Sequence, residues 1–139
     1  MDTLQAGILL AKFDIFPEEI GLRQQVAHRY NELLDPLSHI ERQNIPKGYK
    51  SAWAQYSILA ADTQQRTDLQ SKLKEAEIPT AVYYPTPLHL QTAFAYLGYQ
   101  EGDFPVSEDC SKRIFSLPMH PYLKPEEQER IAEVIKKIE

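Results

Sequence analysis

Proline placement constrains the fold of this chain more than any other feature of its sequence. Ten of the 139 residues are proline. Proline has no backbone N–H and a fixed φ, so it is tolerated in the first turn of a helix or at a sheet edge and interrupts either element elsewhere. Pro17 and Pro125 stand at the start of helical patterns, whereas Pro36 and Pro79 follow such patterns. We therefore expect short helices and short strands.

Apolar residues at helical spacing predict five helices. Near the N-terminus Leu4, Ile8 and Ala11 recur at this spacing, and Asp2 or Thr3 can cap the helix. The last segment begins with acids and ends with lysines, an order that the helix dipole favours. The predicted helices cover residues 1–16, 17–36 and 62–79, the first part of 104–118, and 124–139.

The strand patterns are short and alternate with these helices. "SAWAQYSILAAD" (51–62) is the best strand, with Trp53, Tyr56, Ile58 and Leu59 as its large apolar residues. "TAVYY" (80–84) and the end of 104–118 predict two further strands, and the loop at 35–53 has room for one more. This order predicts an α/β (α+β) fold, in which helices flank a short three-stranded sheet and two helices lead into it.

Composition excludes several classes of function. The length suits one domain, and a net charge of −5 with scattered cations gives no basic stripe, so we expect no nucleic-acid partner. Cys110 is the one cysteine, so no intrachain disulfide forms. No apolar run approaches the ~20 residues of a membrane helix, and the N-terminus lacks a signal-peptide pattern. We therefore expect a cytoplasmic protein without a membrane partner.

The sequence also lacks the motifs of a self-contained catalytic or metal site. Its five glycines are scattered, so it has no glycine-rich phosphate loop. Neither Cys/His metal spacing nor a G-x-S-x-G motif is present. We assign no catalytic, cofactor-binding or metal-binding residue, and expect either a binding module or part of a larger enzyme.

The segment "VYYPTPLHLQ" (82–91) is the most specific cluster of polar and aromatic residues. Pro85 and Pro87 disfavour helix in the residues before them, so Tyr84 and Thr86 should follow an extended path from the end of a strand. Rigidly held strand ends often carry binding groups. If the strand reaches Tyr83, the two tyrosines point to opposite faces. A surface loop whose tyrosines pack on the edge of the core is the alternative.

Four other residues are weaker candidates, each with a structural interpretation. His89 suits a loop histidine with a backbone partner. His120 suits a tight connection between a strand and the last helix. We expect Cys110 to be a buried, inert thiol, and Lys12 to extend from its helix to solvent rather than form a Schiff base.

Four stretches occur in a characteristic order and together span nearly the whole chain: "MDTLQAGILLAKFDIF", "RQQVAHRYNELL", "TAVYYPTPLHLQTAFAYLGYQEGDFPVSE" and "SLPMHPYL". In this order they resemble the C-terminal part of the DegT/DnrJ/EryC1/StrS sugar aminotransferases, which are pyridoxal-phosphate (PLP) enzymes of fold type I. The resemblance looks closest to enzymes that aminate C3 of UDP-linked keto-hexuronates for surface polysaccharide such as lipopolysaccharide.

The resemblance implies that residues 36–139 form the small C-terminal domain and residues 1–35 the interdomain helices. The family's cofactor lysine and most of its phosphate contacts lie upstream of this chain. A missing N-terminal PLP domain is therefore an expected partner, and we expect no PLP on this chain alone and no activity from it. The implied full-length enzyme is a homodimer that moves an amino group from glutamate to a nucleotide-linked ketosugar.

The family motif H-Y-P-x-P-L-H, near the sugar at the mouth of the active site, carries over to part of the segment. Tyr84, Pro85, Pro87, Leu88 and His89 match it. Tyr83 stands where histidine is common; it keeps a hydrogen-bonding hydroxyl but does not titrate near neutral pH. Tyr83, Tyr84 and His89 are therefore the predicted substrate-binding residues.

Two alternatives to a sugar aminotransferase domain remain. "YYPTPLH" could serve a non-enzymatic interaction module as a proline-rich, extended segment that binds a partner. A small regulatory ligand-binding domain is the other. If the resemblance holds, apolar surface of the first helix should lie exposed, and "LQAGILLAKFDIF" should mediate self-association.

Overall fold

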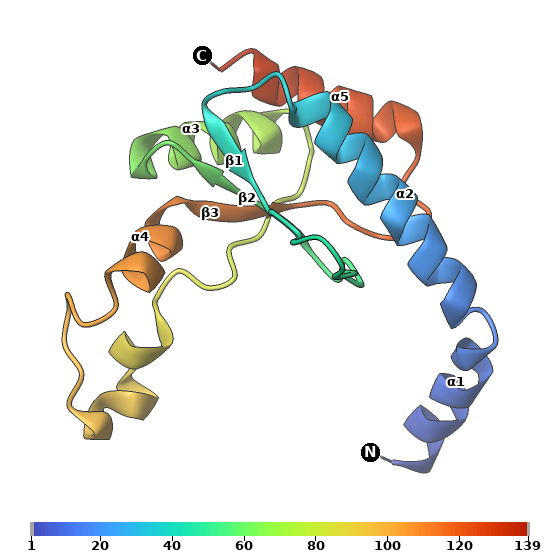
Figure 1. Ribbon diagram of the computed structural model, residues 1–139, viewed down its shortest axis with the longest axis horizontal. Helices are drawn as coiled ribbons and strands as arrows, with labels where there is room; N and C mark the ends of the chain where they lie inside the picture. The colour runs from blue at the N-terminus through green and yellow to red at the C-terminus, as the bar shows by residue number, and fades with distance from the viewer. Residues whose placement is uncertain (1, 139) are drawn as a thin grey trace.

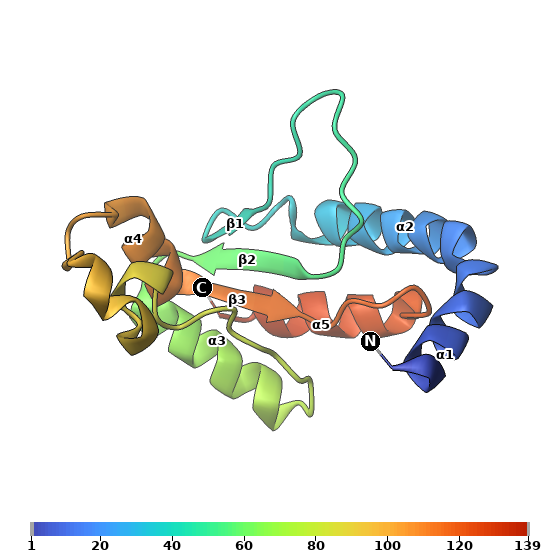
Figure 2. The ribbon, with the colours of Figure 1, turned by 90° about the horizontal axis from the view of Figure 1, so that it is seen from below.

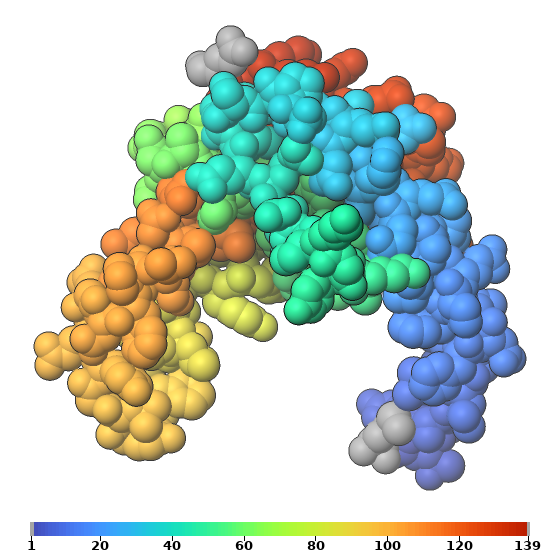
Figure 3. Space-filling view, in the orientation of Figure 1, coloured from blue at the N-terminus to red at the C-terminus, as the bar shows by residue number. Residues whose placement is uncertain are grey.

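The computed structural model describes residues 2–138 and has the shape of an arch (Figure 1). A small sheet, with helices α3 (Thr63–Glu75) and α5 (Pro125–Lys136) on one side, forms its top. One arm is helix α1 (Thr3–Phe13) with the start of α2 (Phe16–Leu34). The other arm is yellow to orange, and its last element, helix α4 (Pro105–Arg113), leads back to the sheet. The space-filling view shows a wide hollow between the arms (Figure 3).

The sheet has three strands, as the sequence predicts, and the structure shows that they are antiparallel. Strand β2 (Tyr56–Ala60) lies between β1 (Ile40–Arg42) and β3 (Ile114–Leu117). Figure 2 shows the three strands side by side, with α5 behind them. Two short 3₁₀ helices, η1 (Leu88–Leu90) and η2 (Thr92–Leu97), lie in the second arm. All five predicted helices are present.

The helix ends follow the predicted local chemistry. Asp2 accepts a hydrogen bond from the amide of Gln5, and Asp62 accepts one from the amide of Gln65, so both aspartates cap their helices. Pro17 and Pro125 lie in the first turns of α2 and α5. There a missing N–H costs no helical hydrogen bond.

Stacked aromatic rings fill the centre of the core. The rings of Tyr30 and Tyr56 lie 4.8 Å apart, and Trp53 stacks on Tyr56 at 5.4 Å. Tyr30 donates to the carbonyl of Pro118 (3.0 Å) and Tyr56 to the amide oxygen of Asn31 (2.7 Å). Burial raises the pKa of Tyr56 to about 12. These bonds join α2, β2 and the end of β3 into one core.

Two details of the strand predictions were wrong. Residues 80–84 form no strand, because only Ala81 pairs with β3, through two hydrogen bonds with Ser116. Pro79, Pro85 and Pro87 flank that pair and cannot donate to a ladder. Trp53 lies before β2 and has a positive φ of 49°.

Helix α1 buries none of its residues, although it is largely apolar. Helix α2, by contrast, places Val26, Tyr30 and Leu34 in the core, on the side that the helical spacing predicts. Among the described residues, no helix is both long and apolar enough to cross a membrane.

Candidate functional site

The tyrosine segment (residues 82–91) leaves the edge of β3 directly after Ala81 and borders a cleft of about 570 Å³. We call this hollow the tyrosine cleft. One wall comes from the tyrosine segment and the other from α4 and the start of β3. Its main lining residues are Tyr83, Tyr84, Thr86, Leu88 and Gln91 on the first wall and Ser107, Cys110 and Ile114 on the second.

Both predicted tyrosines line this cleft. No strand reaches Tyr83, so the alternation of a strand does not point the two tyrosines to opposite faces. Their rings meet edge to face, with centroids 5.9 Å apart. Tyr83 is 45% exposed and Tyr84 is 69% exposed, so both hydroxyl-bearing rings are available to a ligand. An aromatic ring with a hydroxyl offers an apolar face and a polar tip at the same place.

His89 lies apart from the tyrosines. It is in η1, its side chain is nearly buried, and its Nε2 lies 3.0 Å from Oε1 of Glu108. This side-chain partner replaces the backbone partner that we expected from the sequence. His89 is not among the residues that line the tyrosine cleft, whereas its neighbour Leu88 is.

Glu108 organises the second arm. Its carboxylate accepts hydrogen bonds from the amides of Gly102 (2.9 Å) and Phe104 (3.2 Å) as well as the contact from His89. Burial alone would raise the pKa of Glu108, but these two amides and His89 outweigh burial and lower it. This role could not be predicted from the sequence, because an acid in the first turn of a helix is ordinary.

A second hollow, of about 330 Å³, lies beside the tyrosine cleft. We call it the aromatic pocket. It shares Leu88 and Ser107 with the cleft, so these two residues separate the hollows. Its other lining residues are His89, Phe94, Leu97, Tyr99 and Phe104.

Arg113 fastens the second arm to the sheet. Its guanidinium donates to Asp109 within α4 (2.7 Å) and to the carbonyl of Ala60 at the end of β2 (2.8 Å). It also lies 3.4 Å from Glu41 in β1. Arg66 of α3 adds a bond to the carbonyl of Ser111 (2.9 Å). These contacts hold the α4 wall of the tyrosine cleft in place.

The remaining candidates lie as follows. Cys110 is half-buried and lines the tyrosine cleft, so the expectation of a buried thiol was wrong. Lys12 is exposed on α1. His120 is exposed in the connection from β3 to α5, where its carbonyl accepts the amide of Leu123 (3.3 Å). That turn fits the tight connection predicted there.

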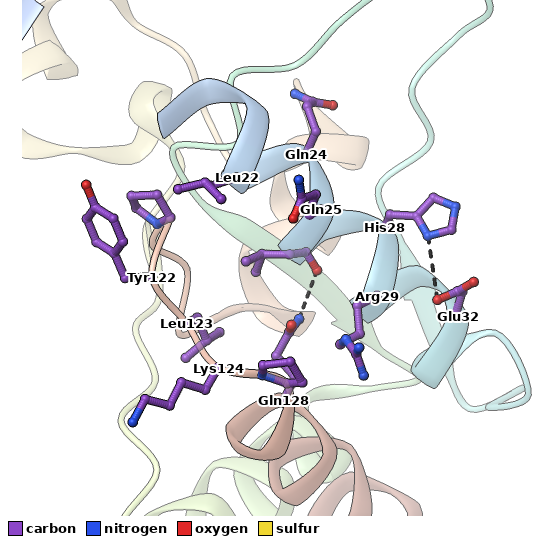
Figure 4. Close-up of a pocket in the computed structure, with 13 residues that line it drawn as sticks. Leu22, Gln24, Gln25, His28, Arg29, Glu32, Tyr122, Leu123, Lys124 and Gln128 are labelled. Carbon is purple, nitrogen blue, oxygen red and sulfur yellow. Dashed lines mark hydrogen bonds and ion pairs between the residues drawn. The ribbon is translucent and has the colours of Figure 1, made fainter. Parts of the chain in front are cut away.

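A larger hollow, of about 760 Å³, lies between α2 and the start of α5 (Figure 4). It shares no lining residue with the tyrosine cleft. Gln128, which is buried, donates to the carbonyl of Val26 (2.8 Å), and the exposed His28 and Glu32 face each other at 3.5 Å. These two contacts are therefore made within the lining of the hollow.

Charge is absent from the immediate walls of the tyrosine cleft. Residues 75–111 contain neither lysine nor arginine. Within the described part of the chain, no three His, Cys, Asp or Glu residues group so as to hold a metal ion. The tyrosine cleft can thus donate and accept hydrogen bonds and stack on a ring, but it cannot neutralise phosphate.

These features define a domain of mixed α/β fold with a cleft lined by tyrosine rings and hydroxyl groups. The chain belongs to the DegT/DnrJ/EryC1/StrS aminotransferase family, whose model matches residues 1–136. It is 43% identical, over 127 residues, to the UDP-2-acetamido-2-deoxy-3-oxo-D-glucuronate aminotransferase of Pseudomonas aeruginosa. That match covers 88% of this chain and 32% of the relative, so the chain spans about a third of its curated relatives.

Solved structures of the family confirm the fold. A DegT/DnrJ/EryC1/StrS aminotransferase from Brucella abortus is 43% identical, with a TM-score of 0.87 over 99% of this chain and 35% of its own. A Streptococcus pneumoniae relative in a PLP form is 25% identical, with a TM-score of 0.82 over 93% of this chain and 33% of its own. The resemblance seen in the sequence is thereby confirmed, and PLP is a cofactor of family members.

The residues of this chain do not fit a PLP site. Such a site needs a lysine that is partly shielded from water, so that its amine can form an imine. Every lysine of the chain is exposed, and none lines the tyrosine cleft or the aromatic pocket.

Proposed function

We propose that this chain provides the small C-terminal domain of a PLP-dependent aminotransferase that acts on a UDP-linked ketosugar. Residues 36–139 would form that domain, and residues 1–35 would connect it to a cofactor-binding domain. Family membership and the relative that acts on a UDP-linked 3-oxo-glucuronate support this substrate class. By analogy with the same relative, we propose that the full-length enzyme acts in the biosynthesis of surface polysaccharide. It would use glutamate as amino donor and be active as a homodimer.

The tyrosine cleft is the observation that carries the proposal. Tyr83, Tyr84 and Thr86 offer three hydroxyls along one wall, and two exposed rings can cover the C–H face of a sugar. An uncharged wall of this kind suits the hydroxyls of a hexose. The diphosphate must meet its cations outside residues 75–111, which have none.

The chain's own part in the reaction is to bind and orient the sugar. PLP, when bound in the full enzyme, supplies the electron sink for amino transfer. No residue of this chain forms or breaks a bond to it. In this proposal Tyr83 and Tyr84 contact the sugar directly, and His89 shapes the cleft through its neighbour Leu88.

A titration of the ¹⁵N-labelled chain with UDP-N-acetylglucosamine tests the proposal by NMR. We expect saturable shifts of the amides of Tyr83, Tyr84 and Thr86, with an affinity on the order of millimolar because few polar contacts are made. Replacing both tyrosines by phenylalanine should weaken binding about threefold to tenfold, the value of one or two hydrogen bonds.

The matched control is Tyr49→Phe, which removes the hydroxyl of an exposed tyrosine far from the tyrosine cleft in sequence and outside its lining. This variant should bind like the parent chain. Shifts confined to other surfaces, or equal binding by the double variant, would refute the assignment of the sugar to this cleft.

A further inference from the structure

The aromatic pocket has the lining of a small-molecule site. Its volume of about 330 Å³ lies at the lower end of the range for ligand pockets, which suits a single ring rather than a whole nucleotide. Phe94, Tyr99 and Phe104 contribute aromatic surface, and the last two meet edge to face at 5.1 Å. Aromatic side chains stack on nucleic-acid bases with little regard to sequence, because every base has a π-face.

His89 contributes a polar ring to this largely apolar lining, and the contact with Glu108 fixes the hydrogen-bonding role of one of its nitrogens. Glu108 is an ionised acceptor, since the amides of Gly102 and Phe104 donate to it. Nε2 of His89 must therefore be the donor in their 3.0 Å contact. In the neutral imidazole this leaves Nδ1 as an acceptor. Within residues 2–138 the one hydrogen bond of the His89 ring is this contact through Nε2, and its side chain is 8% exposed.

These features favour a planar ring that carries an N–H. A purely apolar group, such as a leucine or phenylalanine of a protein partner, would cover Nδ1 of His89 without pairing it, which costs free energy. Uracil offers its N3–H to such an acceptor, and each of its flanking carbonyls can accept from a hydroxyl. Ser107, which also lines the pocket, supplies a hydroxyl.

We propose that the aromatic pocket binds the uracil ring of the UDP-linked substrate, with Nδ1 of His89 accepting the N3–H. The inference rests on the proposed function, because that function makes the substrate a UDP-sugar. Leu88 and Ser107 border both hollows, so base and hexose would lie on the two sides of one shared wall. Glu108 acts as the positioning residue that fixes the orientation of the imidazole.

Free uridine tests this inference because it carries the base but no hexose. Its binding to the aromatic pocket can therefore be judged separately from hexose binding to the tyrosine cleft. We expect uridine to shift the methyl signals of Leu88 and Leu97 and the ring signals of Phe104, with an affinity on the order of millimolar. In 3-methyluridine a methyl group replaces the N3 hydrogen. It should therefore bind at least about fivefold more weakly, as expected when one hydrogen bond is lost and its acceptor is left unpaired.

A pair of protein variants provides the second arm. Tyr99→Leu removes a ring from the pocket, and we expect about fivefold weaker uridine binding. Tyr96→Leu is the matched control, because Tyr96 lies in the same arm, is 81% exposed and does not line the pocket. Equal affinities for uridine and 3-methyluridine, shifts away from the pocket, or no shift at all would overturn the inference. If UDP-N-acetylglucosamine still shifts Tyr83 and Tyr84 in that case, the proposed function survives.

Discussion

Replacing Arg113 by methionine should loosen the arm that carries the tyrosine cleft. The Arg113 side chain is 17% exposed and bonds to the carbonyl of Ala60, which is fully buried. Losing that charge-assisted bond should cost about 1.5–3 kcal/mol. The partner Asp109 is more exposed, and the loss of its ion pair adds about 0.5 kcal/mol. Methionine keeps most of the apolar stem, so packing changes little.

The expected total is a loss of about 2–3.5 kcal/mol in the free energy of unfolding, or about 8 °C in melting temperature for a chain of this length. Urea denaturation followed by tryptophan fluorescence measures it, since Trp53 lies in the core. The control is Arg29→Met, because Arg29 and Glu129 form an exposed pair and should contribute under about 0.5 kcal/mol. Equal losses in both variants would show that the bond to Ala60 does not anchor the arm.

Three further outcomes follow from the structure. The pKa of Glu108 is lowered in the fold, so its ionised carboxylate stabilises the fold fully above the ordinary glutamate range, and this stabilisation fades as pH falls through the pKa of the folded state. Hydrogen exchange of the Gly102 amide should accelerate in that acidic range. In the Glu108→Gln variant the same amide should exchange fast at every pH. The pKa of Tyr56 is raised to about 12, so stability should fall as pH rises from about 10 to 12, and Tyr56→Phe should flatten that loss in an alkaline denaturation series. Ile8 is exposed on apolar α1, so the chain should self-associate at high concentration; Ile8→Glu should reduce its mass in light scattering, and a monomeric parent chain would contradict this.

Local patterns in the sequence predicted the helices and the sheet because their determinants are close in the chain. The caps Asp2 and Asp62 lie next to the helices that they start, and the apolar residues of β2 are consecutive. The prediction of a strand at residues 80–84 was wrong because the flanking prolines limit backbone pairing to Ala81. The segment is extended but forms no ladder of hydrogen bonds with β3.

The site was predictable only in part, for a related reason. Tyr83 and Tyr84 stand out in the sequence, and the structure places both in one cleft. Glu108 meets His89 across 19 residues and Gly102 through a loop, and neither spacing follows a local rule. The aromatic pocket likewise forms only when η1, η2 and the start of α4 fold together.

Saturation transfer from tyrosine protons to bound UDP-N-acetylglucosamine tests the central claim most directly. In a chain deuterated except at tyrosine, the hexose protons should receive more saturation than the ribose protons. The transfer to the hexose should disappear when Tyr83 and Tyr84 are both replaced by phenylalanine that is itself deuterated. Hexose transfer that persists in the double variant, or its absence from the parent chain, would contradict the account of this chain as the sugar-binding wall of an aminotransferase.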